Sequence, residues 1–240
     1  MALIVVNGDG SAEDYFLGRR FSSNLTIEIK PDGDVLPRME RLAGLVQGRS
    51  VLHVGCCDHA PILEQRLADG LWLHASLTQV AQRCLGIDID LKAVEQVKSL
   101  TGFNNLIAAD ITKRGIDEIA SSQWDIALFG DVLEHVQAPV AFLSAFRENY
   151  GKSVKKIIVS VPNCMRGGNA IGALRSRETI NSDHCFEFSP FTLAKVMTLS
   201  GFHIQEFYYS TATALRFPKS IIYKNRPYLA HTLIAVSSMT

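Results

Sequence analysis

Short apolar runs recur along the chain, separated by amphipathic segments of helical length. The first five runs are nearly continuous and rich in β-branched residues, which is typical of strands covered on both faces. The last two alternate between apolar and polar positions, which favours a place near a sheet edge. The seven runs span residues 51–54, 85–88, 106–109, 124–129, 156–161, 202–209 and 229–236.

Helical patterns fill the intervals between these runs. Pro139 and Pro190 stand where the first turn of a helix tolerates a missing N–H, and Ser189 is a favourable N-cap. The alternation predicts an α/β fold with an open parallel sheet. The predicted helices span residues 60–68, 91–100, 116–121, 139–149 and 190–200.

Three segments lack a clear period, and one of them, residues 211–228, joins the last two runs. Residues 1–48 precede the first strong strand, and we expect an irregular or partly helical extension that is a candidate substrate cap. Residues 164–182 have the length of a lid or a binding loop. We therefore divide the chain into an N-terminal extension, 1–48, and a main domain, 49–240.

Composition narrows the classes of function. The 240 residues include 24 Lys plus Arg and 24 Asp plus Glu, with 47% hydrophobic residues. This balance excludes an intrinsically disordered chain and disfavours a nucleic-acid partner, which needs clustered cations. No apolar stretch has the length of a membrane span and no signal peptide is visible, so we expect a cytoplasmic protein without membrane insertion. The five cysteines are expected to be free thiols.

Small and acidic residues follow the predicted strands, where open α/β sheets bind ligands. Gly55 lets the chain turn sharply and approach a ligand closely. Asp88 presents a carboxylate that suits the two hydroxyls of a ribose. Asp110 is placed to accept from an exocyclic amine, and Ile111 to cover a flat ring. Capping is the open alternative for Asp110 and the natural interpretation of Asp90.

The end of the fourth strand is also polar. Gly130 and Asp131 are expected to line the same crevice. Glu134 and His135 follow, a pair that we interpret as supporting hydrogen-bonding residues, with a catalytic role as the alternative. His184 comes after the long loop.

In this order, the strand-end residues resemble the class I S-adenosylmethionine-dependent methyltransferases, in particular the branch with a D-x-L-E-H-V segment after strand four. The resemblance covers residues 49–236. It rests on residues 51–56, 86–88, 109–110, 131–136 and 161–163, and on His184 followed by 188–189 and 200–202.

The resemblance implies a Rossmann-like, seven-stranded, mostly parallel sheet with helices on both faces and an antiparallel last strand. It implies S-adenosylmethionine as cofactor and methyl transfer to an oxygen, nitrogen or carbon of a small-molecule, lipid-precursor or glycan acceptor. His184, and after it His135, are the candidate general bases, because imidazole titrates near neutrality. The expected donor contacts are Gly55, His59, Asp88, Ile89, Asp110, Ile111, Gly130 and Asp131.

The glycine motif departs from the family pattern. His53 stands where the family has an acidic residue, and Cys57 and His59 stand where it has glycines. Their side chains would crowd a donor bound in the usual pose. This motivates an alternative, a catalytically inactive methyltransferase-like binding or assembly domain. A nicotinamide-dependent dehydrogenase is disfavoured, because such an enzyme needs a G-x-G-x-x-G motif after the first strand. Of the three glycines in that motif, this chain has only Gly55.

A zinc site is a further alternative. His53, Cys56, Cys57, His59 and His74 are suitable ligands by type. Their spacing is not that of paired Cys-x-x-Cys knuckles, and no second ligand cluster is visible in the sequence. We therefore expect no metal.

Basic residues in the two late loops would suit an anionic acceptor, although solvated loop charges are the commoner explanation. Together with the strand-end acids, they predict an acidic donor side and a basic acceptor side of one crevice. The basic residues are Arg166, Arg175, Arg177, Arg216, Lys219, Lys224 and Arg226.

Overall fold

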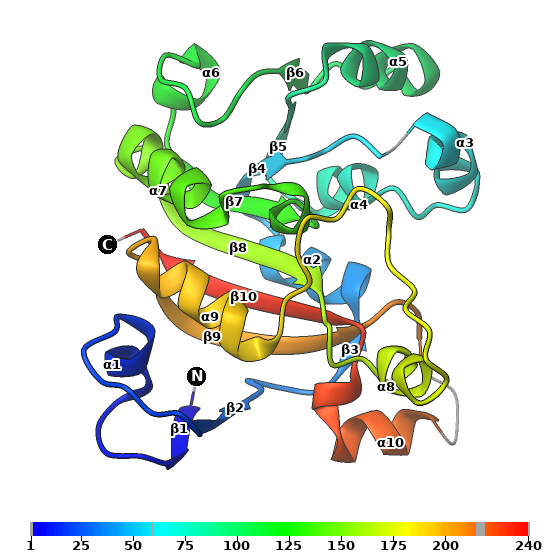
Figure 1. Cartoon of the computed structure of the whole chain (residues 1–240). Helices are drawn as coiled ribbons and strands as arrows, with labels where there is room; N and C mark the ends of the chain where they lie inside the picture. Colours follow the sequence, from blue (N-terminus) through cyan, green and yellow to red (C-terminus); the bar gives the residue numbers. More distant parts are fainter. Residues whose placement is uncertain (1, 59, 215–218, 240) are drawn as a thin grey trace.

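An eight-stranded sheet forms the centre of the computed structural model (Figure 1). The structure describes residues 2–58, 60–214 and 219–239. The strand order is β3-β9-β10-β8-β7-β4-β5-β6. The strands are β3 (Leu36–Pro37), β4 (Ser50–Val54), β5 (Arg83–Asp88), β6 (Leu106–Ala108), β7 (Trp124–Gly130), β8 (Val154–Pro162), β9 (His203–Thr211) and β10 (Thr232–Ser238).

The sheet is mostly parallel, as predicted. β8, β7, β4, β5 and β6 run parallel to their neighbours in this series, whereas β10 is antiparallel to both β8 and β9. All seven predicted runs contain a strand. The eighth strand, β3, has two residues and ends in Pro37, so it carries no alternating pattern that the sequence could have revealed.

The expected edge position of the last strand is wrong. β10 lies inside the sheet, between β8 and β9, and six of its seven residues are buried. Its polar residues give it the alternation of a strand with one face in solvent, although Thr232 and Ser237 are buried. The Ser237 hydroxyl donates to the His203 carbonyl at 2.6 Å, so this buried polar group has a partner inside the protein.

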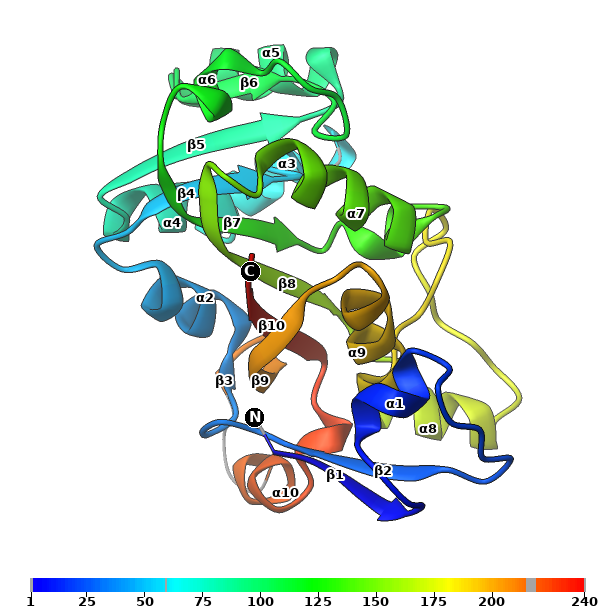
Figure 2. The same ribbon diagram turned by 90° about the vertical axis from the view of Figure 1, so that its left-hand side faces the viewer.

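Helices cover both faces of the sheet, as Figures 1 and 2 show. Alternate strand residues point to opposite faces, so that Phe129 joins the core under α7 and α9, while Leu128 joins the core under α2 and α4. The helices around the sheet are α2 (Arg38–Val46), α3 (Ala60–Ala68), α4 (Leu73–Val80), α5 (Leu91–Thr101), α6 (Asp117–Ala120), α7 (Pro139–Tyr150) and α9 (Pro190–Leu199).

Most of the N-terminal segment packs at the β9 end of the sheet (Figure 2). It contains a hairpin that the sequence did not reveal, made of β1 (Ala2–Asn7) and β2 (Thr26–Lys30), and the short helix α1 (Ala12–Phe16). Ile29 is fully buried in the main core. Its N–H donates to the Tyr228 hydroxyl at 2.7 Å, and its carbonyl accepts from the Tyr209 hydroxyl at 3.2 Å. These contacts tie the segment to the sheet.

Short helices occupy the late loops. The segment 164–182 contains α8 (Gly167–Leu174), and the last connection contains α10 (Lys219–Asn225) and the 3-10 turn η2 (Pro227–Leu229). A further 3-10 turn, η1 (Leu133–His135), follows β7. Across 2–58, 60–214 and 219–239, no helix has both the length and the apolar character that crossing a membrane requires.

Two of the histidines that are suitable zinc ligands by type lie in contact inside the core. His53 on β4 and His74 on α4 are buried, and their Nδ1 atoms are 3.2 Å apart. Nε2 of His74 lies 3.2 Å from the Asn105 amide nitrogen. Burial lowers the pKa of both imidazoles, that of His74 to about 4. The pair is therefore neutral in the folded protein near pH 7.

This pair predicts a loss of stability in acid. A histidine whose folded pKa lies below 6.5 stabilises the fold fully above pH 6.5, and this contribution falls as the pH drops toward the folded value. For His74, the loss between pH 7.5 and 4 is about 3 kcal/mol. Urea unfolding should show a shallower pH dependence for His74→Gln than for wild type. His203→Gln, at an exposed position on β9, is the control. Equal slopes for wild type and His74→Gln would refute the explanation.

Candidate functional site

A cavity of about 840 Å³ opens at the carboxyl ends of β4, β5, β6 and β7. Parallel strands place their ends at one edge, so residues far apart in the sequence meet there. Every predicted site residue lines this cavity except His59, which lies outside the described residues. The predicted residues in the lining are Gly55, Asp88, Ile89, Asp110, Ile111, Gly130, Asp131, His135 and His184.

Gly55 makes the first turn of the cavity wall. Its φ is +70°, a conformation that side-chain-bearing residues rarely adopt. A Cβ at this position would overlap Cγ2 of Val132. The Gly55 N–H donates to the Ile87 carbonyl at 2.8 Å, which fixes the turn to β5. Glycine is therefore required here by backbone conformation and by space.

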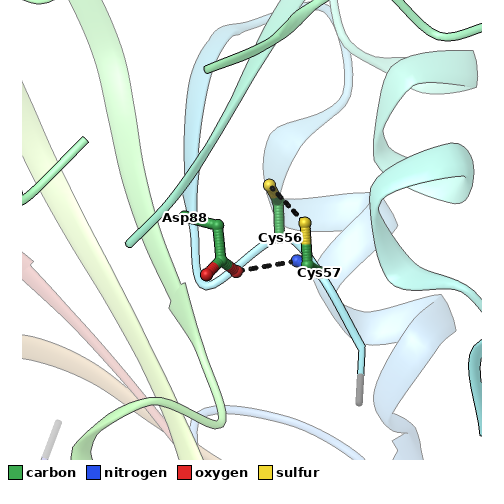
Figure 3. Close-up of side chains that lie close together, drawn as sticks. All are labelled: Cys56, Cys57 and Asp88. Carbon is green, nitrogen blue, oxygen red and sulfur yellow. Dashed lines mark hydrogen bonds between the residues drawn. The ribbon is translucent and has the colours of Figure 1, made fainter. Parts of the chain in front are cut away.

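Asp88 holds the loop that follows Gly55. One carboxylate oxygen accepts from the Cys57 N–H at 3.0 Å (Figure 3). The other oxygen accepts from the Asp90 N–H at 3.1 Å. Asp90 caps α5 by accepting from the N–H groups of Lys92 and Ala93. The interpretation of Asp90 as an N-cap is confirmed, and Asp88 is the carboxylate of this pair that lines the cavity.

Asp110 and the two isoleucines contribute a third wall. The Asp110 carboxylate accepts from the Thr112 N–H at 2.9 Å and from its hydroxyl at 2.6 Å. These hydrogen bonds lower the pKa of Asp110. They shape the turn after β6, well before α6 begins at Asp117. Ile111 is buried, whereas Ile89 is 74% exposed.

Asp131 is held in a strained conformation beside Gly130. Its φ is +59°, which is uncommon for a residue with a side chain and occurs at functional sites. One of its carboxylate oxygens accepts from the Ser160 hydroxyl at 3.2 Å, and the other pairs with the Arg38 guanidinium at 3.1 Å. Arg38 also donates to the Ser160 hydroxyl. Together these contacts fix the floor of the cavity.

A second group of polar side chains lines the same cavity. Glu134, His135 and His184 each place a potential ligand atom within 4.8 Å of the others. The two imidazole rings meet edge to face, with centroids 4.8 Å apart. Asp183 contacts Nδ1 of His135 at 3.2 Å. The structure thus brings together the two histidines that the sequence proposed as bases.

Glu134 is the most unusual member of this group. Its side chain is 1% exposed, and neither carboxylate oxygen has a hydrogen-bond partner among the described residues. Burial, with the nearby charge of Asp131, raises the pKa of Glu134 to about 8. Burial also lowers the pKa of His184, with a further contribution from His135. The backbone carbonyl of Glu134 accepts from the Cys185 N–H at 2.7 Å, and this hydrogen bond joins η1 to the late loop.

The adjacent cysteines Cys56 and Cys57 also line the cavity. Their sulfur atoms are 3.9 Å apart, and Cys57, Cys56 and Asp88 form a second group with metal-ligating atoms (Figure 3). Cys56 is buried in an apolar cluster with Trp72 and Leu63. Contact with Cys57 and burial raise the pKa of the Cys56 thiol. All five cysteines are free, as predicted.

Sequence reasoning missed several residues of the cavity. Arg38 belongs to the N-terminal segment, and no motif links it to Asp131. Asp58 pairs with Arg66 at 2.9 Å, and the indole N–H of Trp72 donates to the Cys56 carbonyl at 2.8 Å. All of these contacts join separate elements, so periodicity could not reveal them.

The basic residues of the late loops contribute little to the described cavity lining. Of the seven loop cations, Arg166 is in the lining, together with Asp183 and Glu187. Arg175, Arg177, Lys224 and Arg226 are not in it. Arg216 and the side chain of Lys219 lie outside the part that the structure describes. The lining is thus mixed in charge, and the basic acceptor side stays a prediction.

No protein-family model matches the chain, and no match is found among curated proteins. Solved structures do match. Magnesium protoporphyrin IX methyltransferase from Synechocystis PCC 6803, crystallised with bound SAH, is 15% identical, with 84% of this chain and 82% of that chain covered and a TM-score of 0.52.

Two other structures have similar scores. Small RNA methyltransferase HEN1 is 18% identical with a TM-score of 0.53, over 88% of this chain and 26% of that chain. A Listeria monocytogenes protein, described as an S-adenosylmethionine-dependent methyltransferase, is 12% identical with a TM-score of 0.51, over 83% and 94%. The chain thus has the fold of the S-adenosylmethionine-dependent methyltransferases.

Gly55→Ala should lower the free energy of unfolding by about 2 to 4 kcal/mol, because it adds backbone strain and an overlap with Val132. Gly102→Ala is the matched control: its φ is +72°, and a Cβ there meets nothing within 4 Å. Chemical denaturation should show a smaller loss for the control, and Gly55→Ala/Val132→Ala should recover part of the difference. Equal losses for Gly55→Ala and Gly102→Ala would refute the overlap.

Proposed function

We propose that this protein is an enzyme that transfers a methyl group from S-adenosylmethionine to an oxygen, nitrogen or carbon of an acceptor. One observation carries the proposal. A single cavity joins the strand-end residues Gly55, Asp88 and Asp110 to the cluster of Glu134, His135 and His184. Donor and acceptor would therefore share one cavity.

The donor end fits this cofactor in three respects. The Gly55 turn removes a side chain where a ligand must approach the backbone closely. Asp88 presents a carboxylate for the ribose hydroxyls, and the Asp110 turn with Ile111 offers a polar edge and an apolar face for adenine. Cys57 replaces the family glycine, but its N–H points to Asp88, so the loop is ordered by the carboxylate.

S-Adenosylmethionine supplies an activated methyl group on a positively charged sulfur. The protein's part is to align the acceptor with that group and to exclude water. An oxygen or nitrogen acceptor also loses a proton, and His184 and His135 stand at the acceptor end, where they would receive it. Both remain our candidates for this role because of their position in the cavity.

The acceptor that we propose is a small molecule, a lipid precursor or a glycan. A cavity of about 840 Å³ holds the donor and a compact acceptor. The zero net charge and the mixed charge of the acceptor end give no broad attraction for polyanions. Because the similar structure HEN1 is a small RNA methyltransferase, RNA is the acceptor class to test against this proposal.

An inactive binding domain is the second candidate, favoured by Cys57 and by the altered loop around it. Calorimetric titration with S-adenosylmethionine separates the two, because a domain without a donor site gives no heat. Acceptors would then be screened by release of S-adenosylhomocysteine, with small hydroxylated compounds, glycans and short RNA in parallel arms.

Asp88→Ala should raise the dissociation constant for S-adenosylmethionine about 10- to 100-fold, because each hydrogen bond to a carboxylate contributes about 1.5 to 3 kcal/mol. Asp90→Ala is the matched control, since Asp90 caps α5 and does not line the cavity. Calorimetry should find donor affinity close to wild type in the control. Near-normal affinity in Asp88→Ala would refute the assigned donor position.

His184→Ala should slow single-turnover methyl transfer to the acceptor found in the screen by about 100-fold or more. Donor affinity should change little, because His184 is not among the residues that we assign to the donor. His203→Ala, at an exposed position, controls for the loss of a histidine. An unchanged single-turnover rate in His184→Ala would remove this residue from the reaction.

A further inference from the structure

A buried carboxylate without a partner is costly, so its retention in the cavity needs a physical reason. Glu134 is 1% exposed, and both of its carboxylate oxygens lack a hydrogen-bond partner among the described residues. Native proteins pair such oxygens, or use them to hold a cation. The side chain faces the cavity that His135 and His184 also line.

The neighbours of Glu134 are suitable for binding a metal. Glu134, His135 and His184 bring one carboxylate oxygen and two imidazole nitrogens within 4.8 Å of one another. Nδ1 of His184 is buried and has no hydrogen-bond partner within the described chain. Asp183 contacts Nδ1 of His135 at 3.2 Å. A carboxylate that holds one ring nitrogen in this way orients the other nitrogen toward a metal.

We propose that Glu134, His135 and His184 bind a divalent transition-metal ion at the acceptor end of the cavity. Two imidazoles and one carboxylate form a set that binds Zn²⁺, Mn²⁺ or Fe²⁺ and leaves coordination positions open. Mg²⁺ prefers oxygen ligands and keeps its waters, so it binds this set more weakly. The set is built by tertiary structure, since residues 134 and 184 belong to different loops.

The second ligand group, Cys56, Cys57 and Asp88, is a weaker candidate. Cys56 is buried among apolar side chains. Both Asp88 oxygens already accept backbone N–H groups, from Cys57 and Asp90. A metal there would displace contacts that order the loop, whereas a metal at Glu134 satisfies atoms that have no partner.

The role of the ion rests on the proposed function and makes that function more specific. An ion at this position favours an oxygen acceptor. An acceptor hydroxyl bound at an open coordination position becomes more acidic and releases its proton to solvent. An oxygen lone pair then forms the new bond to the methyl carbon. The bond between that carbon and the donor sulfur breaks, and its electron pair stays on sulfur. With the ion bound, the two histidines act as ligands.

Binding of the ion can be tested without any acceptor. Protein stripped with a chelator would be titrated with Zn²⁺, Mn²⁺ and Mg²⁺ by calorimetry, with bound metal measured by elemental analysis. We expect one Zn²⁺ or Mn²⁺ per chain, at least tenfold tighter than Mg²⁺, and a metal-dependent rise in melting temperature. Glu134→Gln and His184→Ala should each weaken binding by about 100-fold or more.

Two control variants locate the site. Cys57→Ser and His203→Ala should both bind the ion as wild type does, because Cys57 belongs to the other ligand group and His203 is exposed on β9. Glu134→Gln replaces an unpartnered buried carboxyl group with a neutral amide of similar size, so without metal it should melt no lower than wild type. Wild-type affinity in Glu134→Gln, loss of binding in Cys57→Ser, or no stoichiometric binding at all would overturn the proposal.

Donor binding separates this inference from the proposed function. If S-adenosylmethionine binds and methyl transfer proceeds equally with and without metal, the metal site is wrong and the methyltransferase proposal stands. If the metal binds at Glu134 but the donor does not bind, the site stands and its role in methyl transfer is wrong. Loss of transfer on chelation, restored by Zn²⁺ or Mn²⁺, would support both.

Discussion

The common direction of β8, β7, β4, β5 and β6 is the constraint on which the site depends. Because these strands are parallel neighbours, their carboxyl ends lie at one edge of the sheet. β4, β5, β6 and β7 bring Gly55, Asp88, Asp110 and Asp131 to the same space at or just after their ends. The antiparallel β10, which lies between β8 and β9, adds no residue to the described cavity lining.

Stability and function conflict most clearly around β7. Asp131 adopts a left-handed conformation, and Glu134 is buried without a partner for either oxygen. Both features cost free energy, and both residues line the cavity. Arg38 offsets part of this cost by pairing with Asp131. Residues that are unfavourable for folding are concentrated where the chemistry is proposed to occur.

The pattern of the sequence was sufficient to predict an element wherever burial and residue spacing are properties of that element alone. The runs around Val54, Ile87 and Phe129 became strands because continuous apolar residues can be covered on both faces. Ser189 became an N-cap because its hydroxyl reaches the Thr192 N–H. The pattern failed for β10, where internal hydrogen bonds satisfy the polar residues. It also failed for the hairpin at residues 2–30, which depends on contacts with β9 and η2.

The sequence by itself determined the sheet, its helices and the strand-end residues, because hydrophobic periodicity and turn chemistry are local properties. Tertiary structure alone decided which polar atoms share the cavity and which are left without partners. Arg38 reaches Asp131 from the N-terminal segment, and His184 reaches Glu134 across a long loop. Such encounters depend on packing between distant elements, and no spacing along the chain encodes them. The charges of the crevice were therefore visible in the sequence, whereas their pairing was not.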